Sequence, residues 1–85
     1  MTTFSLKVVG PEGVLAEAEA ESIVLPGAGG SLGVLAHHEP WTILLKQGAV
    51  SWKVAGREWQ SVEIASGVAS VEGTRTVVLA DAAGK

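Results

Sequence analysis

Two groups of side chains in this 85-residue chain have the residue types needed for chemistry. The first is the cluster His37-His38-Glu39, whose imidazole and carboxylate groups are ligands that zinc accepts. Adjacent side chains of an extended segment point to opposite sides, and helical zinc sites space their histidines four residues apart. The chain has no cysteine and a single aspartate, Asp81, so further ligands are scarce. We therefore interpret the two histidines as turn residues and predict no metal site.

The second group is a row of carboxylates at alternate positions, Glu17, Glu19 and Glu21. Paired carboxylates work as acid and base only when burial or close approach separates their pKa values. An exposed strand face provides neither condition, so the row is interpreted as a solvated face. Asp81, the only aspartate, lies four residues from the last residue, so a Ser-His-Asp triad would have to use the end of the chain. We predict a protein without catalytic residues.

Residues 27–33, Gly-Ala-Gly-Gly-Ser-Leu-Gly, look like a phosphate-binding loop but fail in detail. A dinucleotide fingerprint that starts at Gly27 needs its third glycine at position 32, which is Leu32. The sequence predicts no following helix whose N-terminus could hold a phosphate. We predict no nucleotide cofactor. Loops held by a rigid scaffold often carry binding residues, so this segment stays a candidate for contact with a protein partner.

The elements that position these residues are predicted to be short strands. Gly and Pro recur at spacings that leave little room for helices. Apolar and polar residues alternate in segments 4–8, 14–21, 50–54 and 60–64, and this period of two is typical of antiparallel sheets with one wet face. Residues 16–21 are rich in Ala and Glu, which favours a helix by propensity, but their strict alternation favours a strand. Seven to ten short strands indicate an all-β sandwich or barrel.

The three tryptophans divide by face. Trp52 shares its predicted face with Val50 and Val54, so we expect it in the core. Trp59 shares its face with polar residues, so we expect it to be exposed and a candidate for a protein interface. Trp41 follows a proline and fits either class.

The composition fits one globular domain over residues 1–85, with 47% hydrophobic and 18% charged residues. The net charge of −3 argues against nucleic acid or an anionic membrane as partner. No stretch approaches the ~20 apolar residues of a spanning helix, and the N-terminus lacks the pattern of a signal peptide, so we expect a soluble cytosolic protein. The residues alone predict a module for binding or assembly.

The chain resembles the ε subunit of F-type ATP synthase, in order, from about Leu6 to Ala82. The residues that carry the resemblance are Pro11, Leu15, Val24-Leu25-Pro26-Gly27, Gly30, Leu32-Gly33-Val34-Leu35, His38, Pro40, Leu44-Leu45, Gly48, Ser66-Gly67-Val68-Ala69-Ser70-Val71 and Thr76-Val77-Val78-Leu79-Ala80-Asp81.

This resemblance implies a small antiparallel β-sandwich, or flattened barrel, of about ten strands. It implies a non-catalytic rotor subunit of the central stalk that binds the γ subunit and the c-ring and couples ion-driven rotation to ATP synthesis. Such a subunit is peripheral to the membrane, on its cytoplasmic side. The c-ring side is expected at Gly30, Ser31 and Leu32, with His38 and Pro40 in the neighbouring connection.

On the γ side, Trp59 is the candidate contact. The alternative is a free-standing β-sandwich that binds another protein.

Three departures from the family pattern shape these expectations. The family's two C-terminal helices would follow the Leu-Ala-Asp segment, and this sequence ends at Lys85. We therefore expect neither ATP binding nor inhibition of ATP hydrolysis by this chain. Ser31 stands where the family often has Glu, so an uncharged contact with the ring is expected. Ala36 stands where the family has Pro.

Overall fold

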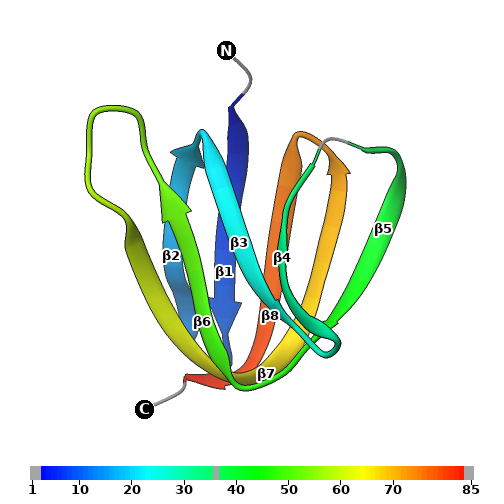
Figure 1. Cartoon of the computed structure of the whole chain (residues 1–85). Coiled ribbons are helices and arrows are strands. Elements are labelled where there is room, and N and C mark those ends of the chain that lie inside the picture. The colour runs from blue at the N-terminus through cyan, green and yellow to red at the C-terminus, as the bar shows by residue number, and fades with distance from the viewer. Residues whose placement is uncertain (1–2, 36, 84–85) are drawn as a thin grey trace.

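The structure is a computed structural model that describes residues 3–35 and 37–83, without the side chains of residues 37–38 and 82–83. These described residues form eight strands and no helix, so the predicted all-β class is confirmed (Figure 1). The strands are β1 Phe4–Gly10, β2 Gly13–Ala20, β3 Ser22–Gly27, β4 Gly30–Gly33, β5 His37–Leu45, β6 Gly48–Lys53, β7 Gln60–Gly73 and β8 Arg75–Ala83. No helix in the described part of the chain is long and apolar enough to cross a membrane.

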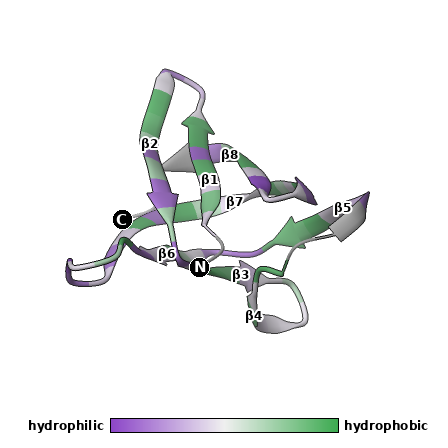
Figure 2. Ribbon diagram, turned by 90° about the horizontal axis from the view of Figure 1, so that it is seen from above, coloured by the Kyte–Doolittle hydropathy of each residue, from purple (hydrophilic) through white to green (hydrophobic). Residues whose placement is uncertain are grey.

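The strands pair in the order β2-β1-β8-β7-β5-β3-β4, and β6 pairs with both β3 and β7. Seen from above, β2, β1, β8, β7 and β5 follow one another as one layer, with β6, β3 and β4 beside it (Figure 2). Most neighbouring strands are antiparallel, as predicted, but β1 and β8 run parallel. Alternation along a strand reports which face is buried and carries no information on the direction of the neighbouring strand.

The long strand β7 joins the two layers. Its first half pairs with β6, and its second half pairs with β8 and β5. The register of the β7–β8 ladder shifts around Ser66 and Gly67, where the strand bends. Ser66 and Gly67 are thus an irregularity within one strand, and the described residues form eight strands instead of the expected ten or so.

The core lies between the layers and is built from the inward-facing residues that the alternation predicts. Trp52 is 6% exposed, and Val50 and Ile64 are fully buried, which confirms the predicted core position of this tryptophan. β2 is a strand, as predicted, with Glu17 and Glu19 exposed. Glu21, the third carboxylate of the predicted solvated row, lies beyond β2, is half-buried and forms an ion pair with Lys53 Nζ at 3.3 Å. The buried hydrophobic residues are Phe4, Leu6, Val8, Ala20, Ile23, Leu25, Val34, Ile43, Leu45, Val50, Trp52, Ile64, Ala69, Val71, Val78 and Ala80.

Candidate functional interface

The glycine-rich segment 27–33 is a β-hairpin, so its description as a loop was wrong. β3 and β4 pair antiparallel, with Leu25 opposite Leu32 and Gly27 opposite Gly30. Ala28 and Gly29 form the turn between them. Gly30 has a φ of 130°, a conformation that favours glycine. Glycine at 27 also allows close packing, because a Cβ there would lie 2.7 Å from Cδ2 of Leu32. The glycines therefore serve a tight hairpin.

This hairpin is held against β5 by backbone hydrogen bonds. The amide of Ala28 donates to the carbonyl oxygen of Leu44 at 2.9 Å, and the amide of Lys46 donates to the carbonyl oxygen of Pro26 at 2.9 Å. On β4, Ser31 is exposed, whereas Leu32 is half-buried and packs against the core. The hairpin thus presents the Ser31 hydroxyl and main-chain groups to solvent, and Leu32 contributes mainly to packing.

The other two residues expected on the c-ring side, His38 and Pro40, lie in β5 and not in a connection before it. Pro40 is exposed, and the side chain of His38 lies outside the described residues. The hairpin turn contacts β5 at Leu44, four residues beyond Pro40, so about 13 Å of extended strand separates the two positions. In Figure 1 the hairpin turn lies at the lower end of the molecule, and β5 begins at the upper end. The expected interface residues therefore occupy two places on neighbouring elements.

Trp59 is 51% exposed, which confirms its predicted outward position. It belongs to the connection between β6 and β7, since β7 begins at Gln60. The amide of Arg57 donates to the carbonyl oxygen of Val54 at 2.9 Å, and Lys53 Nζ donates to the carbonyl oxygen of Arg57 at 3.1 Å. The connection lies at the upper end in Figure 1, away from the β3–β4 turn. A role of Trp59 in partner binding stays a prediction.

Sequence reasoning missed a line of aliphatic side chains on the outer face of the larger layer. Strand pairing brings one outward residue from each of five neighbouring strands into register, and we call this set the apolar row. Its members, in order from β5 to β2, are Leu44, Val68, Leu79, Val9 and Val14. One sign was available in the sequence, because Leu44 and Leu79 fall on the polar side of the alternation in their segments.

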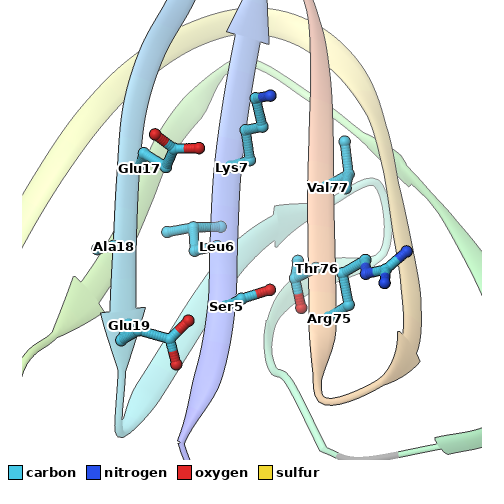
Figure 3. Close-up of a pocket in the computed structure, with 9 residues that line it drawn as sticks. All are labelled: Ser5, Leu6, Lys7, Glu17, Ala18, Glu19, Arg75, Thr76 and Val77. Atoms are coloured by element: carbon cyan, nitrogen blue, oxygen red, sulfur yellow. The ribbon is translucent and has the colours of Figure 1, made fainter.

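Beside the apolar row, the outer face of β2, β1 and β8 is hollowed over the small side chain of Ser5 (Figure 3). Glu17 and Glu19 line the hollow from β2, Lys7 from β1 and Arg75 from β8. Glu19 Oε1 accepts a hydrogen bond from Thr3 Oγ1 at 3.3 Å. The four charged side chains are exposed, so the hollow offers solvated charges of both signs and no buried acid–base pair.

Metal ligands do not gather in the part of the chain that the structure describes. Among those residues no group of three or more His, Cys, Asp or Glu side chains is placed to hold an ion. Both His37 and His38 lie in β5, so their interpretation as turn residues is wrong. Their side chains lie outside the described residues.

Comparisons with known proteins agree on one family. The family model described as "ATP synthase, Delta/Epsilon chain, beta-sandwich domain" matches residues 3–85. The ATP synthase epsilon chain of Desulfitobacterium hafniense is 36% identical over 81 residues, which are 95% of this chain and 61% of that protein. The epsilon chain of Herminiimonas arsenicoxydans is 39% identical over 82 residues, covering 95% of this chain and 59% of that one. The chain thus spans about three fifths of the length of these relatives.

Solved structures show the same fold. A chain of the Euglena gracilis mitochondrial ATP synthase, in a structure of OSCP, F1 and c-ring, superposes with a TM-score of 0.81 at 20% identity and covers 94% of this chain and 51% of its own. A chain of the Tetrahymena thermophila mitochondrial ATP synthase central stalk and c-ring gives a TM-score of 0.70 at 13% identity, covering 94% and 64%. Because the family model matches residues 3–85 of its 85 residues, the chain belongs to the β-sandwich domain family of the ATP synthase delta/epsilon chain.

Proposed function

We propose that this protein is a non-catalytic component of the ATP synthase central stalk that binds the γ subunit and the c-ring. In this role it couples ion-driven rotation to ATP synthesis without transforming a substrate. The observation that carries the proposal is the family match over residues 3–85. The curated relatives named ATP synthase epsilon chain and the structural neighbours from stalk and c-ring assemblies support it.

The hairpin is the proposed contact with the c-ring. Gly30, Ser31 and Leu32 lie on β4, which pairs with β3. Main-chain hydrogen bonds of Pro26 in β3 and of Ala28 in the turn hold the hairpin against β5 and Lys46. A contact that transmits torque needs such a stiff support, because a loosely held loop would yield before the rest of the domain moved. Ser31 is uncharged, so the contact is expected to rest on shape and hydrogen bonds and to depend weakly on salt.

His38 and Pro40, further along β5, are proposed to border this contact. Trp59, in the exposed β6–β7 connection, is the candidate for the γ side. The domain would then lie at the cytoplasmic surface of the membrane, peripheral to it, through its place in the complex.

Reconstitution tests the proposal. The purified chain is added to membrane vesicles whose ATP synthase has been stripped of its own ε subunit, and both binding and ion-driven ATP synthesis are measured. We expect stoichiometric binding and a gain in coupled synthesis. A chain that stays in the supernatant at micromolar concentration would show that the proposed function is wrong.

A further inference from the structure

The edge of β2 that faces away from β1 has no strand beside it. β2 is the last strand of its layer, and among the described residues it pairs only with β1 (Figure 2). The amide of Ser5 in β1 donates to the carbonyl oxygen of Thr74 at 2.8 Å, so the main chain of Ser5 points away from β2. Ser5 is paired with Glu19, and both residues of such an antiparallel pair turn their main-chain groups away from each other. The amide and carbonyl groups at the free edge therefore belong to Glu19 and, two residues earlier, to Glu17.

Beside this edge, the space between the two layers opens as an apolar groove. Ala16 and Ala18 line it from β2, and Val54 and Val62 line it from the other side. These four side chains pack against the core, yet each is only half-buried. Trp52, a core residue, lies at the inner side of the groove.

Gln60 shows that the interlayer space is uncovered at this point. It pairs with Trp52, so its side chain belongs to the inner face of its layer, but Gln60 is exposed. A free strand edge next to an apolar groove offers the two features that strand addition uses. The edge supplies main-chain hydrogen bonds, and the groove supplies space for alternate side chains.

The outer side of the edge is acidic. Glu17 and Glu19 are exposed, and the same two residues carry the free main-chain groups. In an added strand, the residues opposite the glutamates would lie on the outer face and the residues between them would point into the groove. Opposite charges directly across a strand pair stabilise the pairing. The edge therefore fits an extended segment with Lys or Arg at alternate positions and aliphatic residues between them.

The two carboxylates are available to such a segment. Of the ion pairs between described residues, none joins Glu17 or Glu19 to a base. Glu19 accepts a hydrogen bond from Thr3, a neutral group that leaves the charge uncompensated. Lys7 lies across β1 from Glu17, and Arg57 lines the groove from the β6–β7 connection, so neither base occupies the free edge.

A second copy of this chain fits the edge poorly. If two β2 edges paired antiparallel, the free main-chain groups of both would belong to Glu17 and Glu19, and carboxylates would face carboxylates. Like charges directly opposite each other destabilise a strand pair. Charged edge strands are one means by which natural sheets avoid edge-to-edge association.

We propose that the β2 edge and its groove bind an extended basic segment of another protein as an added strand. The main chain of this segment pairs with Glu17 and Glu19, and its aliphatic side chains enter the groove toward Trp52. Its lysine or arginine side chains lie on the outer face beside the two carboxylates. The inference goes beyond the proposed role in the stalk and does not depend on it, since the site uses neither the β3–β4 hairpin nor Trp59.

A short synthetic peptide that alternates lysine and valine is the probe, and a peptide that alternates glutamate and valine is its control. Amide hydrogen exchange of the whole chain is followed by NMR. In the free chain the amides of Glu17 and Glu19 are expected to exchange fast, whereas the amide of Ala18, which points to β1, is protected. The lysine peptide is expected to slow exchange at Glu17 and Glu19 roughly tenfold or more at saturation. The glutamate peptide is expected to leave it unchanged.

Variants of the chain test the two sides of the site. Glu17→Lys combined with Glu19→Lys is expected to weaken binding of the lysine peptide roughly tenfold and to admit the glutamate peptide. Leu15→Ser removes an apolar side chain that lines the groove and is expected to weaken binding of the lysine peptide. Leu35→Ser is the matched control, because Leu35 is 70% exposed and does not line the groove, and its affinity should stay within about twofold.

An N-methylated form of the lysine peptide tests the main-chain hydrogen bonds. It keeps every side chain but cannot donate from its backbone, so it is expected to bind roughly tenfold more weakly. Equal binding of the methylated peptide would show that no strand is added, and the proposal would be wrong.

Thermal unfolding checks that each variant is folded, and the comparison of peptides on the unchanged chain decides the question even if a variant is not. A lysine peptide that leaves Glu17 and Glu19 unprotected at millimolar concentration would overturn the proposal. Protection that instead rises with the concentration of the chain alone, together with a dimer in analytical ultracentrifugation, would assign the edge to a second copy and would also overturn it.

Discussion

Gly67 of β7 lies directly against Leu79 of β8. A Cβ at position 67 would collide with the carbonyl oxygen of Leu79 and would lie 3.0 Å from the Cα of Ala80. Main-chain atoms of a paired strand cannot turn aside as a flexible side chain can. The bend that lets β7 serve both layers therefore depends on glycine at this position.

Gly67→Ala is accordingly expected to lower the free energy of unfolding by about 2–4 kcal/mol, since the β7–β8 ladder must open to admit the methyl group. Denaturant unfolding followed by tryptophan fluorescence measures the change. The control is Gly29→Ala in the hairpin turn, where a Cβ would meet no atom within 4 Å. A loss at position 67 no larger than the loss at position 29 would refute the close-approach argument.

Trp52 and Trp59 are expected to respond differently to truncation. Trp52 is 6% exposed in the core and Trp59 is 51% exposed. Trp52→Ala should cost about 3–5 kcal/mol of unfolding free energy, a large part of the stability of so small a domain. Trp59→Ala should cost less than about 1 kcal/mol, as surface substitutions do. Calorimetric unfolding of both variants compares them, and equal destabilisation would contradict the assignment of their faces.

Thr76→Val is expected to stabilise the fold. Thr76 is fully buried, and its Oγ1 has no hydrogen-bond partner among the described residues. Burial of an unpaired hydroxyl costs about 1–3 kcal/mol, and valine has nearly the same shape without this cost. We expect a gain of about 1 kcal/mol in unfolding free energy. Thr42→Val, at an exposed position of β5, is the control, and it should change stability by less than about 0.5 kcal/mol. A destabilised Thr76→Val variant would indicate that the hydroxyl is satisfied.

The proposed contact with the c-ring predicts a pattern of cross-links. Ser31 is exposed on the hairpin, so Ser31→Cys should form a disulfide with a cysteine placed in the polar loop of the ring. Arg75 begins β8 at the opposite end of the sandwich, so Arg75→Cys should not react. Lys7→Cys, on the outer face of β1, is a second negative control. Mass spectrometry after oxidation reads the outcome. A cross-link from position 75 but not from position 31 would mean that the domain sits the other way up.

Alternation along single strands predicted local properties correctly. It identified residues 16–21 as a strand against their helix propensity. In the structure residues 16–20 belong to β2, and Glu21 follows the end of the strand. It also separated buried Trp52 from exposed Trp59. These properties depend on which of two faces a residue occupies, and a period of two in the sequence states this directly.

The tertiary structure alone decided how the strands combine. The parallel pairing of β1 with β8 and the unbroken course of β7 through Gly67 arise from contacts between segments far apart in the sequence. The apolar row exists only because the registers of four strand pairs place Leu44 and Leu79 in one line with three valines. Register is set by packing of the whole sandwich, because a shift of one residue would turn every buried side chain outward. A sequence therefore states the face of each residue, whereas its neighbours on that face come from the fold.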